Sequence, residues 1–327
     1  MKTLLTAAVV ALTATSAFAR DNIQVAGSST VLPYASIVAE AYGENFDFPT
    51  PVVESGGSSA GLKRFCDGVG ENTIDIANAS RPIKDSEREA CAANGIDSIT
   101  EVRIGYDGIV FATDKNLKGL EDLTEGQLYL AMSANYDYTS WKQVDAALPD
   151  VRIMVYIPGT KHGTREVFEE KVLLEGCKAV GDYDKFLAET GDKKAATKKC
   201  GEVDHMRASD IDGDYTETLA RIGSEPTAMG VFGLAFYYNN TDKINVSTIN
   251  GVVPSQETIA NGEYPVSRPL FFYVKDAHVG VIPGLAEYVQ FFVSDQIAGP
   301  DGPLVEYGLV ADPELAETQE KVNALGN

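Results

Sequence analysis

Three short loops rich in glycine, serine and threonine each follow an apolar, β-rich run and precede a helical pattern. They are GSSTV (27–31), SGGSSAG (55–61) and PGTKHGTRE (158–166). The first backbone N–H groups of a helix are unpaired and carry partial positive charge, and glycine and hydroxyl side chains bring further donors close. One such loop is more typical of an ordinary helix cap. Several at successive strand ends favour a shared anion site.

Two arginines accompany these loops. Arg81 follows Ser80 at the end of another apolar run, and Arg165 follows Thr164 at the start of a helical pattern. A guanidinium matches the geometry of an oxyanion because it donates two parallel hydrogen bonds. The alternative is that Arg165 pairs with Glu166 or Glu169 on the helix surface and Arg81 with a nearby acidic residue. Both arginines are predicted here to contact the anion.

Asp107, in IGYDGIV (104–110), is predicted to accept a hydrogen bond from a protonated oxygen of the anion. Phosphate at neutral pH keeps one or two O–H groups that need an acceptor, whereas sulfate has none. A buried carboxylate would therefore bind phosphate and reject sulfate, because two like charges would be left unpaired. The alternative is an Asp-Gly turn.

An enzyme is a second reading of the same loops. GSSAG (57–61) matches G-x-S-x-G with Ser59 as nucleophile, and His162, His205 or His278 could complete a triad. This reading leaves the loops at 27–31, 80–82 and 163–165 unexplained. The nucleotide-binding G-x-x-x-x-G-K-[ST] motif is absent. We expect no enzymatic activity and no cofactor. We also expect no metal site, since neither CxxC nor clustered histidine spacing occurs.

The elements that position these residues alternate between strands and helices, which predicts parallel sheets with ligands beyond the carboxyl ends of the strands. Apolar runs at 109–113, 230–238 and 269–275 predict further strands, and Ser86 with Glu89 predicts a helix start. A residue before proline is pushed out of the α region, so the stretch flanked by Tyr264-Pro265 and Arg268-Pro269 is extended and is a predicted crossing between two domains. The segment 103–108 is predicted to be a second crossing. The predicted lobes are 20–105 plus 268–327, and 106–267.

The bulk properties indicate an exported protein. The chain has 327 residues and a formal net charge of −21, which disfavours nucleic acid and anionic lipid as partners. Residues 1–19 resemble a cleavable signal peptide ending in Ala17-Phe18-Ala19; an uncleaved anchor is the alternative. Four cysteines in an oxidising compartment allow three pairings. Sequence proximity favours Cys66–Cys91 and Cys177–Cys200.

Six segments, in order along the chain, resemble the PstS-type phosphate-binding proteins of bacterial phosphate ABC uptake. They are AGSSTVLPYA (26–35), ESGGSSAGLKRFC (54–66), DIANASRPI (75–83), IGYDGIV (104–110), GTREVFEE (163–170) and YPVSRPLFFYVK (264–275). The resemblance implies an α/β, two-lobed periplasmic binding protein of type II that holds inorganic phosphate between its lobes. We also expect a monomer. Its partners would be an inner-membrane permease and ATPase complex. Binding of sulfate or molybdate, or a scaffold or adhesin role, remains an alternative.

The resemblance also implies ligand contacts. Thr30 and the Val31 backbone, with Ser29 beside them, match the first phosphate loop; Ser58 matches the second, and Gly163 and Thr164 the third. Some members carry an aspartate where this chain has Ser80, so the acceptor role is assigned to Asp107. His162 stands where the family usually has serine. The family's upstream arginine aligns near Pro158, so Arg81 and Arg165 are predicted to supply its charge.

Overall fold

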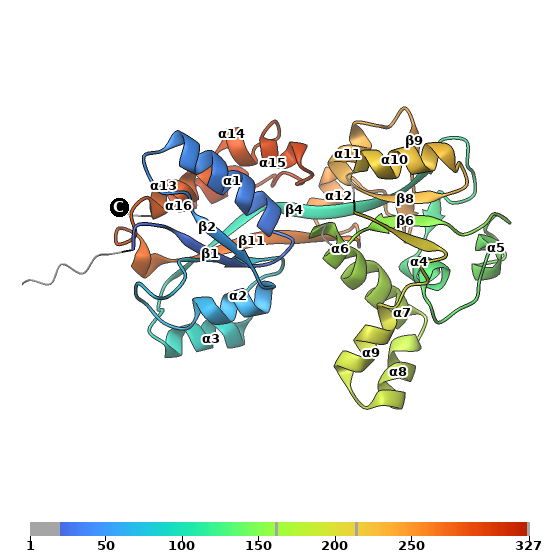
Figure 1. Cartoon of the computed structure of the whole chain (residues 1–327), viewed down its shortest axis with the longest axis horizontal. Coiled ribbons are helices and arrows are strands. Elements are labelled where there is room, and N and C mark those ends of the chain that lie inside the picture. The colour runs from blue at the N-terminus through green and yellow to red at the C-terminus, as the bar shows by residue number, and fades with distance from the viewer. Residues whose placement is uncertain (1–19, 161–162, 213–214, 326–327) are drawn as a thin grey trace, which may run out of the picture.

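The computed structural model describes residues 20–160, 163–212 and 215–325, which form two bodies joined by long strands (Figure 1). The strands are β1 Gln24–Gly27, β2 Val52–Ser55, β3 Ile76–Ala79, β4 Ile99–Asp114, β5 Asp122–Leu123, β6 Val155–Pro158, β7 Ala208–Ile211, β8 Met229–Gly233, β9 Ile244–Val246, β10 Thr248–Ile249 and β11 Ser267–Lys275.

The helices fall into two groups along the chain. The first body carries α1 Leu32–Asn45, α2 Ser58–Phe65, α3 Asp85–Ala93, the 3-10 turn η2 Asp276–His278, α13 Leu285–Phe292, α14 Asp295–Ala298, α15 Pro303–Glu306 and α16 Leu315–Asn323. The second body carries α4 Glu125–Met132, α5 Trp141–Val144, α6 Gly163–Val167, the π-helical segment η1 Phe168–Leu174, α7 Glu175–Ala179, α8 Asp182–Thr190, α9 Lys193–Cys200, α10 Tyr215–Ser224, α11 Leu234–Tyr238 and α12 Gln256–Ala260.

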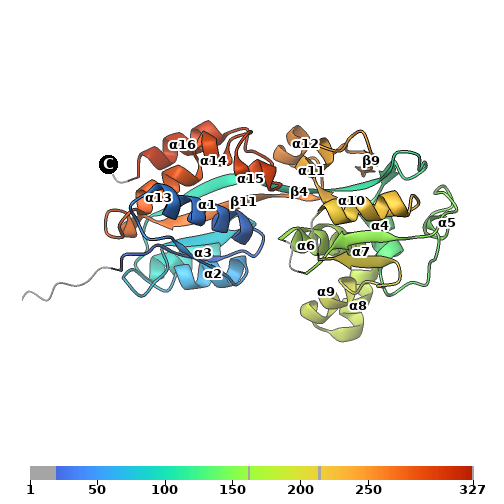
Figure 2. The same ribbon diagram turned by 45° about the horizontal axis from the view of Figure 1, so that its top comes forward.

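One sheet runs through both bodies in the order β2-β1-β3-β11-β4-β8-β6-β7, with β9 beside β4, while β10 and β5 form a separate pair. β1, β2 and β3 are parallel to one another, as are β8, β6 and β7. β11 and β4 pair antiparallel and pass together from one body to the other (Figure 2). The predicted α/β class is confirmed, and the connecting strands make the sheet mixed.

Helices cover both faces of the sheet in the first body, and successive side chains of β3 point to opposite faces. Ile76 packs into a cluster with α1 and α13, whereas Ala77 and Ala79 pack with α2 residues such as Phe65. The second body has its own cluster, which includes Trp141. Each body therefore buries a core of its own.

Two local predictions are wrong. The run 230–238 is not one strand: β8 ends at Gly233, whose extended backbone precedes α11. A short apolar run does not distinguish strand from helix. The helix near Ser86 begins at Asp85, because the Glu87 carboxylate accepts a hydrogen bond from the Lys84 backbone at 2.9 Å.

Both predicted cysteine pairs are confirmed. Cys66–Cys91 connects the ends of α2 and α3, and Cys177–Cys200 connects α7 to α9. Within the described ranges, no helix has the length and apolar character needed to cross a bilayer.

Candidate functional site

The loops that follow β1, β2 and β3 meet at one edge of the sheet, because the three strands are parallel. The Ser28 backbone N–H donates to the Asn78 carbonyl at 2.9 Å. The Ser58 Oγ accepts from the Ser80 backbone N–H at 3.1 Å and lies 3.2 Å from the Ser80 Oγ. Three of the predicted loops, distant in sequence, are thus brought together by backbone and side-chain hydrogen bonds.

Gly27 makes this close approach possible. Its φ is +147°, and a Cβ there would lie 2.1 Å from the Asn78 carbonyl oxygen. We expect Gly27→Ala to lower the free energy of unfolding by about 2 kcal/mol or more, because backbone strain and a backbone clash add. Gly56→Ala is the matched control, since its nearest neighbour would be 3.9 Å away. Equal urea midpoints for the two variants would contradict this expectation.

Asp107 and Arg268 form a buried cross-strand pair where the two bodies join. They are direct register partners on β4 and β11, so their side chains share one face of the sheet. Asp107 is 1% exposed and Arg268 5% exposed. The Asp107 Oδ2 and the Arg268 Nε have no hydrogen-bond partner among the described residues. A buried acceptor and a buried donor are therefore both available at this point.

The electrostatics of Asp107 are unusual for a carboxylate. Burial raises its pKa to about 6; nearby Arg268 opposes this shift and nearby Glu166 adds to it. Desolvation disfavours the charged form and outweighs the attraction of the guanidinium. Asp107 therefore changes its protonation close to physiological pH.

The Arg268 guanidinium also reaches the first loop and the second body. Its Nη2 donates to the Thr30 Oγ1 at 2.6 Å and lies 3.3 Å from the Glu166 Oε2, while its Nη1 donates to the Glu170 Oε2 at 2.8 Å. Sequence reasoning missed Arg268 as a site residue and used it only as the residue before Pro269. The predicted crossings 264–269 and 103–108 do pair, but only the observed register places Arg268 opposite Asp107.

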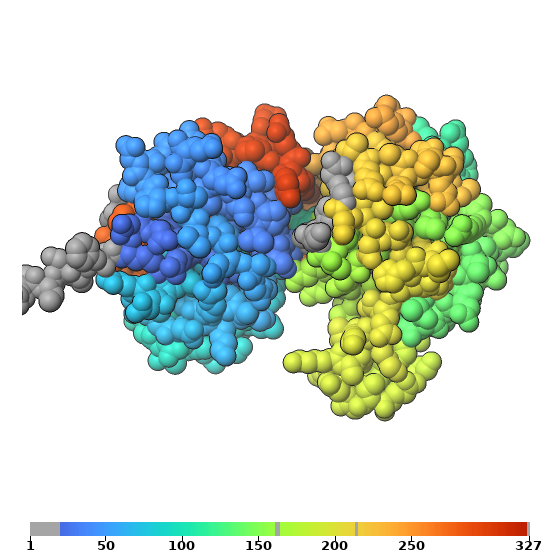
Figure 3. Space-filling model, in the orientation of Figure 1, coloured from blue at the N-terminus to red at the C-terminus, as the bar shows by residue number. Residues whose placement is uncertain are grey.

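A cavity of about 520 Å³ lies between the two bodies. Residues of the first body, of the join and of the second body line it, among them Thr30, Asp107, Thr164 and Tyr215. Figure 3 shows the groove between the two bodies in the space-filling view. The Tyr215 hydroxyl donates to the Thr164 Oγ1 at 3.5 Å. The cavity therefore brings four of the predicted residues, Ser29, Thr30, Asp107 and Thr164, to one space.

Comparison with known proteins decides the family. Residues 12–296 match the family described as the PBP superfamily domain. The protein SphX of Synechococcus elongatus is 31% identical over 265 residues, covering 79% of this chain and 69% of that protein. The phosphate-binding protein PstS of Staphylococcus epidermidis is 30% identical over 295 residues, covering 88% and 78%. The chain belongs to the PBP superfamily, among its PstS-type members.

Solved structures of proteins with a similar fold agree with this assignment. A possible phosphate-binding protein from Planctomyces limnophilus superposes with a TM-score of 0.73 at 25% identity, covering 94% of this chain and 99% of that one. A putative phosphate ABC transporter substrate-binding protein from Clostridium perfringens, solved with bound phosphate, gives 0.52 at 25% identity, with coverage of 89% and 99%. The two-lobed binding-protein fold is thereby established.

The two predicted arginines of this PBP-superfamily chain both have carboxylate partners. Arg81 binds Glu87 through both Nη atoms, at 2.9 and 2.7 Å, and also donates to Ser59. Arg165 pairs with Glu169 at 2.7 Å and with Asp210. The pairing expected as the alternative is therefore observed for both, and anion contact by either one stays a prediction.

Of the remaining predicted residues, Val31 and Gly163 lie at the starts of helices. Val31 is buried directly before α1, and its backbone N–H lies 3.4 Å from the Ser28 Oγ. Ser29 is exposed and lines the cavity. Gly163 begins α6. His162 lies outside the described residues.

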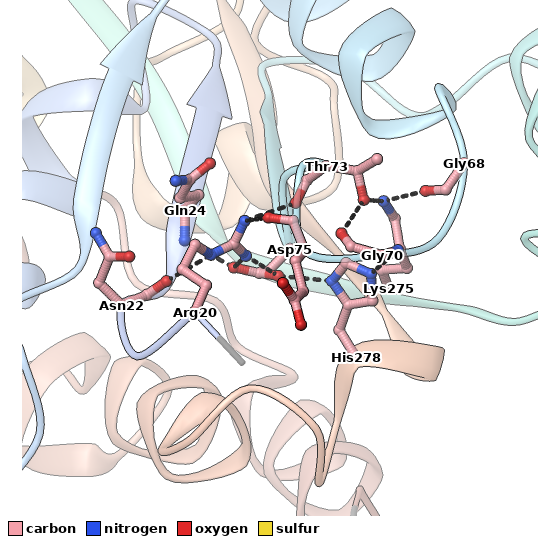
Figure 4. Close-up of polar contacts among 10 residues, drawn as sticks. Arg20, Asn22, Gln24, Gly68, Gly70, Thr73, Asp75, Lys275 and His278 are labelled. Carbon is pink, nitrogen blue, oxygen red and sulfur yellow. Dashed lines mark hydrogen bonds and ion pairs between the residues drawn. The ribbon is translucent and has the colours of Figure 1, made fainter. Parts of the chain in front are cut away.

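The serine-hydrolase alternative finds no support around Ser59. The Ser59 hydroxyl accepts a hydrogen bond from Arg81, which cannot act as a base. His278 is buried elsewhere: its Nδ1 lies 2.6 Å from Asp75 and its Nε2 accepts from the Gly70 backbone (Figure 4). His205 lies 3.3 Å from Asp210. Neither described histidine thus activates this serine.

Asp75 holds together a buried polar cluster that the site does not use (Figure 4). Its carboxylate is fully buried and binds Arg20 through both oxygens, at 2.6 and 2.5 Å, as well as His278. Lys275 donates nearby to the Gly68 carbonyl and to Thr73, and burial lowers its pKa to about 8. The cluster joins the start of the described chain to the end of β11.

We expect Asp75→Ala to lower the free energy of unfolding by about 3–5 kcal/mol, because it leaves the Arg20 charge without its buried partner. Glu54→Ala removes half of an exposed ion pair with Arg64 and should cost less than about 1 kcal/mol. Thermal unfolding of both variants measures the contrast. A small loss in both would show that the buried network is not a stability determinant.

Proposed function

We propose that this chain is a periplasmic phosphate-binding protein that delivers inorganic phosphate to an ABC importer. Relatives named phosphate-binding protein and a structural neighbour with bound phosphate support the ligand class. The proposal includes export through residues 1–19, a monomeric state and delivery to an inner-membrane permease and ATPase complex. It assigns no catalytic step to the protein.

The buried pair Asp107–Arg268 is the observation that carries the proposal. Hydrogen phosphate presents both acceptor oxygens and a proton donor, so it needs at least one acceptor in its site. Asp107 offers an unpartnered oxygen and Arg268 an unpartnered N–H within the described structure. Sulfate would set a second anion beside the carboxylate without a proton between them. The pair therefore favours phosphate over sulfate.

We propose that the anion bridges the two bodies. Thr30, the Val31 backbone, Ser29, Ser58 and Ser80 would serve it from the first body, and His162, Gly163 and Thr164 from the second, with Arg81 and Arg165 as additional charges. Arg268 joins this set. The proposed lobes are 20–105 plus 268–327, and 106–267, with β4 and β11 as the connection.

Closure of the lobes around the anion follows from linkage. A ligand that contacts both lobes binds the closed form better and shifts the equilibrium toward it. The transporter then has a distinct shape to recognise. Each phosphate oxygen should find donors in the closed cleft, because dehydrating the anion is costly.

Titration calorimetry with phosphate and with sulfate tests the proposal. We expect phosphate to bind tightly and sulfate weakly or not at all. Phosphate should also raise the melting temperature, since a ligand that binds only the folded state stabilises it. A sulfate-selective protein, or no binding of either anion, would overturn the assignment.

A further inference from the structure

Three donors converge on one oxygen of Glu166. Its Oε2 accepts from the Thr30 Oγ1 at 2.7 Å and from the Ser29 Oγ at 3.1 Å, and the Arg268 Nη2 lies 3.3 Å away. Two of these donors belong to the first predicted anion loop, and the third is the buried guanidinium. Glu166 itself lies in the first turn of α6, on the second body. A carboxylate of this protein thus contacts groups that the proposed function assigns to the anion.

Glu166 and a bound anion cannot both accept the hydrogen of the Thr30 hydroxyl. The Thr30 hydroxyl has one hydrogen, which it donates to Glu166 while accepting from Arg268. A bound oxyanion that takes the Thr30 hydrogen must displace the Glu166 carboxylate. Charge acts in the same direction, because Asp107, Glu166 and Glu170 already surround the single Arg268 guanidinium. An incoming anion and Glu166 would repel each other.

We propose that Glu166 is an affinity-determining residue that competes with the bound anion for Ser29, Thr30 and Arg268. This inference depends on the proposed function of the same site. The Glu166 side chain is 40% exposed, so it can swing into solvent when an anion arrives. Breaking the contacts of Glu166 with Ser29, Thr30 and Arg268 then costs free energy, which lowers the net affinity for the anion. Anions that make few contacts are excluded, and a strongly bound anion is released more readily to the transporter.

Glu166→Gln tests the competition. An amide is a weaker acceptor than a carboxylate and carries no charge, so we expect phosphate to bind about ten-fold tighter or more. The gain should appear mainly as faster association, because the donors are no longer held by a carboxylate. Glu166→Ala should show the same direction. A residue with a merely structural role would give weaker binding or none when removed.

Glu175→Gln is the matched control. It removes the same charge from α7, which follows α6 and η1 along the chain, and Glu175 pairs there with Lys178 at 2.8 Å. We expect its phosphate affinity to match the wild type within about two-fold. Calorimetry and stopped-flow fluorescence measure the three variants, and melting temperatures verify that they are folded.

The outcomes separate the two proposals. If the wild type binds no phosphate, the proposed function fails and this inference fails with it. If the wild type binds phosphate but Glu166→Gln and Glu166→Ala bind it equally or more weakly, only the inference is overturned. An equal gain in Glu175→Gln would assign the effect to net charge, which also overturns it.

Discussion

Arg268→Gln should weaken phosphate binding by at least about a hundred-fold. The substitution removes the only guanidinium seen to contact Thr30 among the described residues, and it leaves the Asp107 carboxylate buried without a positive partner. The proposed contact between the buried guanidinium and the anion is a hydrogen-bonded charge pair, and truncating one partner of such a pair typically costs about 2–5 kcal/mol in binding. Calorimetry with phosphate measures the loss, and circular dichroism verifies the fold.

Arg81→Gln is the comparison for that variant. Glu87 and Ser59 already bind the Arg81 guanidinium, which is about a quarter exposed. We therefore expect a smaller loss of phosphate affinity, below about ten-fold. If Arg81→Gln lost as much affinity as Arg268→Gln, the buried Arg268 would not be the main source of positive charge for the ligand.

Asp107→Asn should lower the ratio of phosphate to sulfate affinity by at least about ten-fold, because a neutral amide removes the repulsion that excludes sulfate. Sulfate binding should strengthen while phosphate binding weakens only modestly, since the amide oxygen still accepts the phosphate proton. Competition calorimetry with both anions measures the ratio. Equal changes for both anions, or no change, would remove the acceptor role from Asp107.

The wild type should show the same effect as a function of pH. Since the pKa of Asp107 is raised to about 6, its carboxyl group is ionised well above that pH and neutral below it. Sulfate affinity should therefore rise as pH falls through about 6, and this rise should be absent in Asp107→Asn. Without ligand, the raised pKa of Asp107 makes the free energy of unfolding decrease as pH rises from about 4 to about 6. An ion-paired carboxylate with a lowered pKa would have the opposite effect.

The sequence predicted the parts of the site that local patterns encode. Glycine and hydroxyl residues between a strand and a helix revealed the loops at Thr30 and Ser58, and sequence proximity favoured both cysteine pairs. Arg268 was missed because its role depends on the register between two strands more than 150 residues apart. Glu166 appeared in sequence only as a helix-surface partner for Arg165. Its contact with Thr30 depends on how the two bodies face each other, which no local pattern encodes.

The continuous pairing of β4 with β11 has a consequence for the entropy of ligand capture. The two strands are hydrogen-bonded from Ser267 opposite Gly108 to Lys275 opposite Ile99, with a register shift between Leu270 and Phe271. Because hydrogen bonds hold the two strands in register, we expect relative rotation of the bodies to occur mainly as twisting of this strand pair. An anion that arrests this twisting loses little of its binding free energy to ordering the protein. A small, strongly hydrated ligand makes few contacts, so its affinity depends on this low cost of ordering the protein.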